Sequence, residues 1–148
     1  MDFVVEHLKG HGIRPSVQRV AIMRYLMEHC SHPTVDDIYR DLHAMMPTLS
    51  RTTVYNTLSL LEGKDALSVL TIDSRNVHYD GDVKPHAHFM CRECRRIFDV
   101  PLAGAGLNGS PATPDGFKVE HTHLYYDGLC DRCREKEDAA LAKETYFI

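Results

Sequence analysis

The chain has 148 residues, of which 43% are hydrophobic and 26% are charged, and its formal net charge at pH 7 is −4. This composition fits one compact domain or two small ones and excludes a wholly disordered chain. There is no run of about 18 apolar residues and no signal-peptide pattern, so we expect a cytoplasmic protein with no membrane partner. Because the acidic balance provides no basic arm, any binding of nucleic acid requires a local cationic face.

The first part of the chain has the apolar spacing of helices. One amphipathic helix is predicted over residues 17–27. A second begins behind Thr34, a candidate N-cap with Asp37 three residues on, and a third begins near Ser50 and ends at Gly63. The third helix carries a stripe of apolar residues at helical spacing, which predicts that one of its faces is buried.

Two short β-like runs follow these helices, over residues 67–72 and 77–79. The turn-prone segment 73–76 between them predicts a β-hairpin. Three helices and a hairpin are typical of a winged helix, and a small helical domain with an incidental hairpin is the alternative that the pattern leaves open. We assign residues 1–80 to this N-terminal domain.

A polar segment with glycine and proline, residues 81–85, is predicted to be a hinge between two domains. The second domain then spans residues 86–148. Its predicted elements are strands over 86–90, 97–100 and 117–124, a glycine- and proline-rich loop over 102–116, and a charged helix over 131–143. The fold class predicted for the whole chain is therefore α+β.

Four of the five cysteines form two Cys-x-x-Cys pairs, Cys91 with Cys94 and Cys130 with Cys133. A two-residue spacer turns both thiolates of a pair toward one ion, so two pairs supply the four tetrahedral ligands of a structural Zn²⁺. Redox dithiols are the alternative, but they usually occur as a single pair after a strand. The remaining cysteine, Cys30, lies in an apolar helical context and is predicted to be a small buried hydrophobic residue.

A second group of metal-ligating residue types lies around the first cysteine pair. His86 and His88 are two residues apart, so on a strand both imidazoles face the same side. If the segment Cys91–Cys94 forms the turn of a hairpin, a simple register places His86 opposite Asp99. Three nitrogen and oxygen ligands would then meet on one face of the sheet.

Two residues from the N-terminal part are candidates to complete this site. Asp80 lies beside the predicted hinge, and His32 precedes the second predicted helix. Imidazole and carboxylate ligands without thiolate suit Fe²⁺ or Mn²⁺, whereas Zn²⁺ prefers the four cysteines. His121 and His123 share a strand face in this interpretation, and they are either surface histidines or a further site.

Several segments together match a known family in order and spacing. The chain resembles the ferric uptake regulator family of metal-dependent bacterial repressors. The segments that carry the resemblance are Ile13–Arg19, His32–Tyr39, Ser50–Leu58, His86–Cys94 and Cys130–Cys133. The resemblance implies an N-terminal winged-helix DNA-binding domain, a C-terminal α/β dimerisation domain, a structural Zn²⁺ and a regulatory metal that links the domains. It further implies a transcriptional repressor and not an enzyme, which binds double-stranded DNA at a palindromic operator as a homodimer.

The resemblance also points to one branch of that family. Iron regulators of the family usually have Glu where this chain has Asp80 and Asp99, and the peroxide-sensing branch typically has Asp at both positions. By this resemblance the regulatory ligands are His32, Asp80, His86, His88 and Asp99. Bound iron is implied to oxidise the ligands His32 and His86 when hydrogen peroxide is present. The alternative is an iron- or manganese-responsive repressor of metal homeostasis that does not sense peroxide.

The DNA-reading residues follow from the period of the third predicted helix. With its apolar stripe buried, Arg51, Thr52, Tyr55 and Asn56 face outward at the start of that helix, where a recognition helix meets bases. Arginine reads guanine and asparagine reads adenine, whereas threonine and tyrosine more often contact phosphates. Arg75, in the predicted turn of the hairpin, is placed to reach a phosphate or the minor groove.

Two other classes of protein share single features with this sequence. A zinc-dependent hydrolase or deaminase is superficially similar, because Pro85-His-Ala-His88 precedes a Cys-x-x-Cys pair. Zinc deaminases need a His-x-Glu motif and a Pro-Cys-x-x-Cys motif, and neither occurs here. A zinc-stabilised module for protein interaction would have no reason to carry nitrogen and oxygen ligands in two domains.

Overall fold

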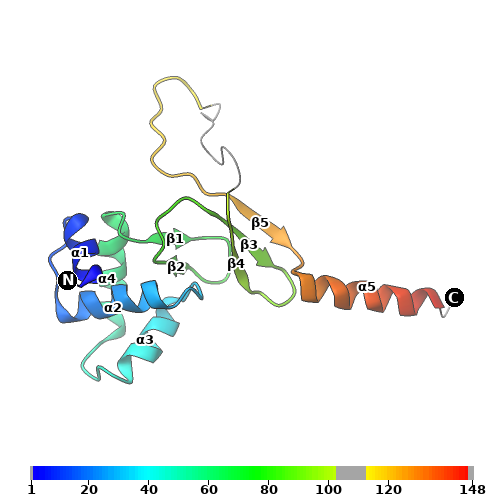
Figure 1. The fold of residues 1–148 in the computed structure, drawn as a ribbon, viewed down its shortest axis with the longest axis horizontal. Coiled ribbons are helices and arrows are strands. Elements are labelled where there is room, and N and C mark those ends of the chain that lie inside the picture. The colour runs from blue at the N-terminus through cyan, green and yellow to red at the C-terminus, as the bar shows by residue number, and fades with distance from the viewer. Residues whose placement is uncertain (1, 103–112, 147–148) are drawn as a thin grey trace. The chain divides into compact units, whose positions relative to one another are not determined.

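The computed structural model describes residues 2–102 and 113–146 (Figure 1). The chain divides into two compact units, Met1–Lys84 (unit 1) and Pro85–Ile148 (unit 2). Helices dominate unit 1, and unit 2 combines a sheet with one helix. The fold is therefore mixed, which confirms the predicted α+β class.

Unit 1 contains four helices. Their bounds are α1 Phe3–Gly10, α2 Val17–Glu28, α3 Val35–His43 and α4 Arg51–Gly63. The three helices predicted from apolar spacing are confirmed as α2, α3 and α4. The prediction missed α1 because an eight-residue helix offers barely two turns of periodicity, with only Val4 and Leu8 buried.

Capping residues explain where the helices of unit 1 begin. The Thr34 hydroxyl accepts the backbone N–H of Asp37, and the Asp37 carboxylate accepts the N–H of Thr34, which completes the predicted capping box. Ser16 caps α2 and Ser50 caps α4 in the same way, each through its side-chain oxygen. Each cap satisfies N–H groups that have no partner inside the helix.

An antiparallel hairpin follows the helices of unit 1. It consists of β1 Ser68–Leu70 and β2 His78–Asp80, with Leu70 opposite His78. The backbone N–H of Tyr79 also donates to the carbonyl oxygen of Pro33, 2.9 Å away, between α2 and α3. Since the hairpin is hydrogen-bonded to the loop between α2 and α3, it is not incidental, and unit 1 has the elements of a winged helix.

The core of unit 1 is apolar and draws on every one of its helices. Leu8, Ile22, Ile38, Leu58 and Leu61 are all fully buried in one cluster. On α4, the buried residues recur at helical spacing and leave the opposite face to solvent. This burial fixes which side chains of α4 are available for binding.

Unit 2 contains a three-stranded sheet and a terminal helix. Its elements are β3 Ala87–Cys91, β4 Ile97–Val100, β5 Tyr125–Gly128 and α5 Asp131–Tyr146. The strand order is β4-β3-β5, with β4 antiparallel and β5 parallel to β3. The strands predicted over 86–90 and 97–100 and the helix predicted from residue 131 are confirmed.

The predicted register of the β3–β4 hairpin is wrong by two residues. Asp99 lies opposite His88, not opposite His86. The turn is wider than a simple hairpin turn, because the N–H of Cys91 donates to the carbonyl oxygen of Arg96 at 3.0 Å and Arg95 adopts a positive φ of 66°. A shift of two residues preserves the face on which each side chain lies. The predicted face of the histidines is therefore retained.

The strand predicted over residues 117–124 is also wrong, since these residues form no strand. Phe117 and Val119 are 70% and 46% exposed, so their alternation with polar residues does not reflect a buried face. The strand begins instead at Tyr125, opposite His88. Most of the loop predicted over 102–116 lies outside the described residues.

Two further observations concern features predicted from composition. Cys30 is exposed, contrary to the prediction, because α2 ends at Glu28 and His29 already has an extended backbone. Over residues 2–102 and 113–146, no helix combines the length and the apolar character needed to cross a bilayer.

Candidate metal centres and nucleic-acid interface

The four paired cysteines meet in unit 2. Their sulfur atoms all lie within 4.8 Å of one another, and Sγ of Cys94 is 3.9 Å from Sγ of Cys130. Cys91 ends β3, Cys94 lies in the following turn, and Cys130 and Cys133 flank the start of α5. The parallel pairing of Cys91 with Gly128 on β5 brings the second pair to the first.

The thiols of this cluster have unequal proton affinities. Burial raises the pKa of Cys91, but backbone N–H groups of Cys130, Cys94 and Glu93 outweigh it and lower that pKa to about 6. The hydrogen bond with Cys130, followed by burial, raises the pKa of Cys133 to about 12. Four thiolates at these distances repel one another, so full ionisation requires a cation among them. The donor set fits a soft, tetrahedral divalent metal such as Zn²⁺.

A group of two histidines and one aspartate lies on the β3–β4 sheet of unit 2. Oδ1 of Asp99 is 3.2 Å from Nε2 of His86 and 3.4 Å from Nε2 of His88. The two imidazole rings are 4.4 Å apart between centroids. Both Nε2 atoms therefore lie near the same carboxylate oxygen. Ligand atoms that share one cation or one proton are arranged in this way.

A second group lies in unit 1. Nε2 of His32 is 3.7 Å from Oδ2 of Asp80, and these residues are 4% and 8% exposed. Asp80 ends β2 and is followed by Gly81, where a Cβ atom would meet the backbone carbonyl group of Leu26 at 2.9 Å. Only glycine fits this close approach of the hairpin to α2. Gly81 thus allows the chain next to Asp80 to pass close to α2.

The five predicted regulatory ligands therefore lie in two groups, one in each unit. Unit 1 supplies His32 and Asp80, and unit 2 supplies His86, His88 and Asp99. All five offer imidazole nitrogen or carboxylate oxygen, which suits Fe²⁺ and Mn²⁺ in hardness. The exposed pair His121 and His123 has ring centroids 6.5 Å apart, which fits both surface histidines and a further site.

The predicted DNA-reading residues share one exposed surface of α4. Arg51, Thr52, Tyr55 and Asn56 are all exposed, whereas the residues on the opposite side of the helix are buried. Arg75 is exposed in the turn between β1 and β2. The helix face and the hairpin turn provide the two elements that a winged helix presents to DNA.

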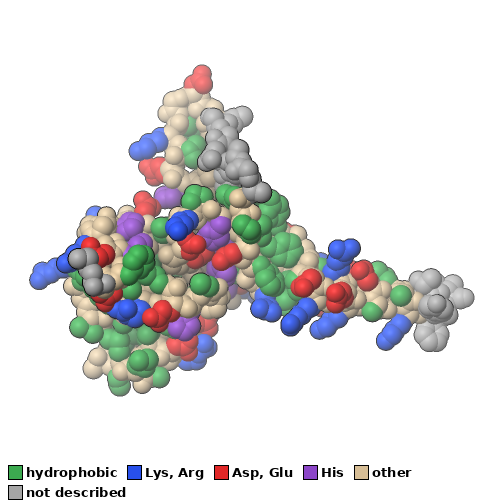
Figure 2. Space-filling model, viewed as in Figure 1, with side chains coloured by type: hydrophobic (Ala, Val, Ile, Leu, Met, Phe, Trp, Pro, Cys, Tyr) green, Lys and Arg blue, Asp and Glu red, His purple; other side chains and the backbone are tan. Residues whose placement is uncertain are grey.

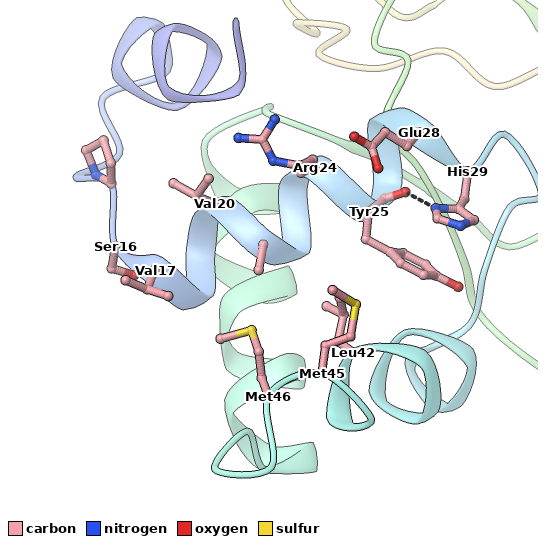
Figure 3. Close-up of a pocket in the computed structure, with 12 residues that line it drawn as sticks. Ser16, Val17, Val20, Arg24, Tyr25, Glu28, His29, Leu42, Met45 and Met46 are labelled. Atoms are coloured by element: carbon pink, nitrogen blue, oxygen red, sulfur yellow. Dashed lines mark hydrogen bonds between the residues drawn. The ribbon is translucent and has the colours of Figure 1, made fainter. Parts of the chain in front are cut away.

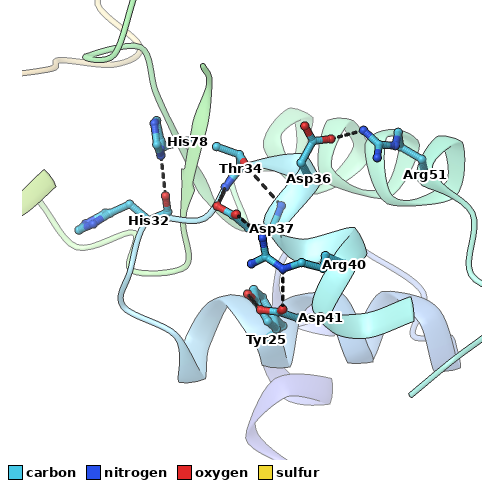
Figure 4. Close-up of polar contacts among 9 residues, drawn as sticks. All are labelled: Tyr25, His32, Thr34, Asp36, Asp37, Arg40, Asp41, Arg51 and His78. Carbon is cyan, nitrogen blue, oxygen red and sulfur yellow. Dashed lines mark hydrogen bonds and ion pairs between the residues drawn. The ribbon is translucent and has the colours of Figure 1, made fainter. Parts of the chain in front are cut away.

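The guanidinium of Arg51 is already oriented within unit 1. It forms an ion pair with Asp36 near the start of α3 (Figure 4). It also lies over the Tyr39 ring, 5.1 Å from its centroid. These contacts restrict a long and otherwise flexible side chain.

Two arginines beside this surface, Arg14 and Arg19, were not among the predicted DNA-reading residues. Arg14, Arg19 and Thr53 line a polar hollow of about 480 Å³, and an adjoining hollow of about 170 Å³ is lined by Arg19, Thr53 and Asn56. The sequence feature that could have identified Arg14 and Arg19 is their position at the start of α2, because helix N-termini attract phosphate. The two arginines form a local cationic face on a chain whose formal net charge is −4.

A third hollow in unit 1 is apolar. It measures about 620 Å³ and lies between α2 and the segment that follows α3 (Figure 3). Val17, Val20, Met45 and Met46 line it, and Val17 and Met45 are 78% and 81% exposed. None of the predicted metal ligands or DNA-reading residues lies in it.

Comparison with known proteins agrees with the fold. A model of the ferric uptake regulator family matches residues 10–127. The peroxide operon regulator of Bacillus subtilis (strain 168) is 36% identical over 135 residues, which cover 90% of this chain and 93% of that protein. The peroxide-responsive repressor PerR of Staphylococcus epidermidis is 32% identical over 134 residues and 89% of each chain. A solved structure of the ferric uptake regulator from Francisella tularensis with iron is 25% identical with a TM-score of 0.66, covering 83% of this chain and 96% of that one.

Proposed function

Because the chain belongs to the ferric uptake regulator family, whose members are transcription regulators and not enzymes, we propose that it is a metal-dependent DNA-binding repressor that senses hydrogen peroxide. It acts as a homodimer on a palindromic operator. The observation that carries this proposal is the convergence of His86 and His88 on one Asp99 oxygen, at 3.2 and 3.4 Å. Metal ligation explains why these two imidazoles meet one carboxylate, and a catalytic acid and base are not needed to explain it.

The four cysteines hold a structural Zn²⁺ in this proposal. The ion balances the charge of four thiolates and fastens the start of α5 to the end of β3 through Cys91, Cys94, Cys130 and Cys133. Metal binding at such a site contributes directly to folding free energy. Zinc therefore stabilises unit 2 and is not the sensing ion.

The regulatory ion takes its ligands from both units. His32 and Asp80 supply one part of the set, and His86, His88 and Asp99 supply the other. Because the ligands come from both units, a bound ion favours one arrangement of the two units. Occupancy of the regulatory metal site is therefore coupled to operator affinity. Mn²⁺ and Fe²⁺ both suit these ligands.

Peroxide sensing requires a redox-active ion, and bound Fe²⁺ supplies reductive cleavage of the peroxide O–O bond. One oxygen atom of hydrogen peroxide would be inserted at a ring C–H bond of His32 or His86, and the other would leave as water, so that peroxide is reduced and the imidazole is oxidised by two electrons. An oxidised ring is a poorer ligand, so the group in unit 1 separates from the group in unit 2. The repressor then leaves the operator.

Operator recognition relies on the exposed surface of α4. Arg51 and Asn56 contact base edges, Thr52 and Tyr55 contact the DNA backbone, and Arg75 reaches the DNA from the hairpin turn. Arg14 and Arg19 add phosphate contacts beside them. Replacing Arg51 or Tyr55 by alanine should weaken operator binding without changing Mn²⁺ affinity measured in the absence of DNA.

The test is peptide mass spectrometry on anaerobically prepared dimer, loaded with Fe²⁺ or with Mn²⁺, before and after peroxide. A gain of one oxygen atom at His32 and His86 in the iron form, with loss of operator binding, is expected. The manganese form should stay unmodified and bound. Asp99→Glu should blunt the response of the iron form by changing the ligand geometry.

Two outcomes would redirect the proposal. Oxidation confined to the four cysteines, with both histidines intact, would reject histidine-based sensing and leave an iron- or manganese-responsive repressor as the function. Equal operator affinity with and without either metal would reject metal-dependent repression itself.

A further inference from the structure

His78, the first residue of β2, contacts two segments of unit 1 at once. Its Nδ1 is 2.6 Å from the carbonyl oxygen of His32 (Figure 4), and its Nε2 is 2.9 Å from Oδ2 of Asp73. A carbonyl oxygen only accepts, so Nδ1 is the donor in the first contact. The ring thus ties the loop that carries a regulatory ligand to the turn of the hairpin.

The Asp73 carboxylate extends this connection into the turn. Its Oδ1 accepts the backbone N–H of Arg75 at 2.9 Å, while its other oxygen contacts His78. An aspartate that accepts the N–H two residues later holds the turn in one shape. The conformation of the turn that presents Arg75 is therefore linked to the position of the His78 ring.

At the other end of the connection, His32 has an unusual backbone. Its φ of 54° lies in the left-handed region, which residues other than glycine rarely adopt. The neighbouring carbonyl group of Pro33 accepts the N–H of Tyr79 at 2.9 Å, so β2 holds this loop at two adjacent carbonyl groups. With this backbone, His32 Nε2 lies 3.7 Å from Oδ2 of Asp80.

We infer that His78 is a positioning residue that links the regulatory ligand His32 to the DNA-contacting hairpin turn. The inference rests on the proposed function and specifies how one of its ligands is connected to one of its DNA contacts. When a bound ion fixes His32, the ring of His78 has one position, Asp73 is held, and the turn is ordered for DNA. An ordered hairpin turn in turn favours the position in which His32 binds the ion, because coupling between two sites is reciprocal.

Two conservative substitutions separate the two contacts of the ring. In His78→Asn the amide nitrogen lies near the position of Nδ1, so the contact with His32 is retained and that with Asp73 is lost. In His78→Gln the amide nitrogen lies near the position of Nε2, so the reverse holds. His11→Gln is the matched control, since the His11 ring contacts the carbonyl oxygen and the ring of His7 at the end of α1.

The experiment uses the full-length dimer and Mn²⁺. Mn²⁺ affinity is measured without DNA, and operator affinity is measured with saturating Mn²⁺ and with chelator. His78→Gln should lower Mn²⁺ affinity about tenfold, which is the lower range for loss of a group that orients a metal ligand. His78→Asn should keep Mn²⁺ affinity within about twofold of the wild-type value. The factor by which Mn²⁺ increases operator affinity should nevertheless fall about tenfold, which is within the usual range of coupling. Circular dichroism confirms that each variant is folded.

The inference is overturned if the two variants have the same Mn²⁺ affinity, or if His78→Asn keeps the full gain in operator affinity. Failure of the proposed function gives a different result. In that case the wild-type protein itself would show no gain with Mn²⁺, while the order of Mn²⁺ affinities would still decide whether His78 positions His32.

Discussion

The two units differ in what holds them folded. Unit 1 has a continuous apolar core, built from residues such as Leu8, Ile22, Ile38, Leu58 and Leu61. In unit 2, the buried hydrophobic residues within the part of the chain that the structure describes are Ala87, Met90, Cys91 and Cys133. Two of these four belong to the cysteine cluster. Unit 2 therefore relies on its metal site where unit 1 relies on hydrophobic burial.

This difference follows from size and composition. A domain below about 70–80 residues rarely gains enough stability from a core alone and usually needs a metal, disulfides or a partner subunit. The helix α5 adds little apolar burial, since Cys133 is the one buried residue among its residues 131–144. Lys, Arg, Asp and Glu side chains are spread along the face of this helix seen in Figure 2. The comparison thus predicts that each unit can be destabilised separately.

The largest effect should come from loss of the cysteine cluster. Cys91→Ser or Cys130→Ser should abolish zinc binding and unfold unit 2, because structural zinc sites of this kind are worth about 10–16 kcal/mol. Hydrogen exchange should show loss of protection in β3 and α5, with the helices of unit 1 still protected. Cys30→Ser is the control, since Cys30 is exposed and lies outside the cluster. Retention of zinc and of protection in unit 2 would contradict the assignment.

A core truncation should produce the opposite pattern. Leu58 is fully buried, so Leu58→Ala should destabilise unit 1 by about 2–5 kcal/mol through lost burial and a cavity. Urea denaturation followed by hydrogen exchange should show early loss of protection in α4 and unchanged protection in β3. Val17→Ala, on an exposed position of α2, should change stability by less than about 0.5 kcal/mol. Equal loss in both units would mean that they fold as one.

An intermediate effect is expected at the close approach of β2 to α2. Gly81→Ala would place a Cβ atom 2.9 Å from the Leu26 carbonyl group, so the hairpin end must shift. Such overpacking costs about 1–3 kcal/mol and displaces Asp80, which should weaken Mn²⁺ binding while zinc content stays unchanged. Gly63→Ala is the matched control, because nothing lies within 4 Å of its added Cβ atom. Unaltered Mn²⁺ affinity in Gly81→Ala would show that this approach does not position Asp80.

The two candidate metal centres also differ in how far the sequence predicts them. The Cys-x-x-Cys spacing is local, and it indicated a four-cysteine cluster that the sheet and α5 bring together. The register of the β3–β4 hairpin could not be predicted, because it depends on the width of a turn that includes Arg95 with a positive φ. The grouping of His86 and His88 with Asp99 still followed, since strand alternation is insensitive to a shift of two residues.

Other features depend on tertiary contacts and left little trace in the sequence. The strand β5 begins at Tyr125 because it pairs with β3, and that pairing is a tertiary contact. Residues 117–124 alternate between apolar and polar side chains but form no strand. The contact of His78 with the His32 carbonyl oxygen spans 46 positions and depends on the hairpin returning to α2. Helix caps such as Thr34 were predictable because capping is a short-range interaction.

The smallest effect expected is an acid-dependent one confined to unit 1. The Tyr25 hydroxyl donates to Oδ2 of Asp41 at 2.6 Å, and this bond, followed by that from Arg40, lowers the pKa of Asp41 (Figure 4). A carboxyl whose pKa is lower in the folded chain stabilises the fold above its unfolded value of about 4, and that contribution disappears as the pH falls through the folded value.

Asp41→Asn keeps an oxygen that accepts from Tyr25 but removes the titrating group. The difference in urea midpoint between wild type and Asp41→Asn should therefore be greatest near pH 6 and shrink steadily toward pH 3. It should be visible for α2 and α3 and absent for β3, because Asp41 connects two helices of unit 1. Glu62→Gln, an exposed carboxyl on α4, serves as the control and should show no such trend. A difference that stays constant with pH would mean that the bond to Tyr25, and not the charge of Asp41, carries the stabilisation.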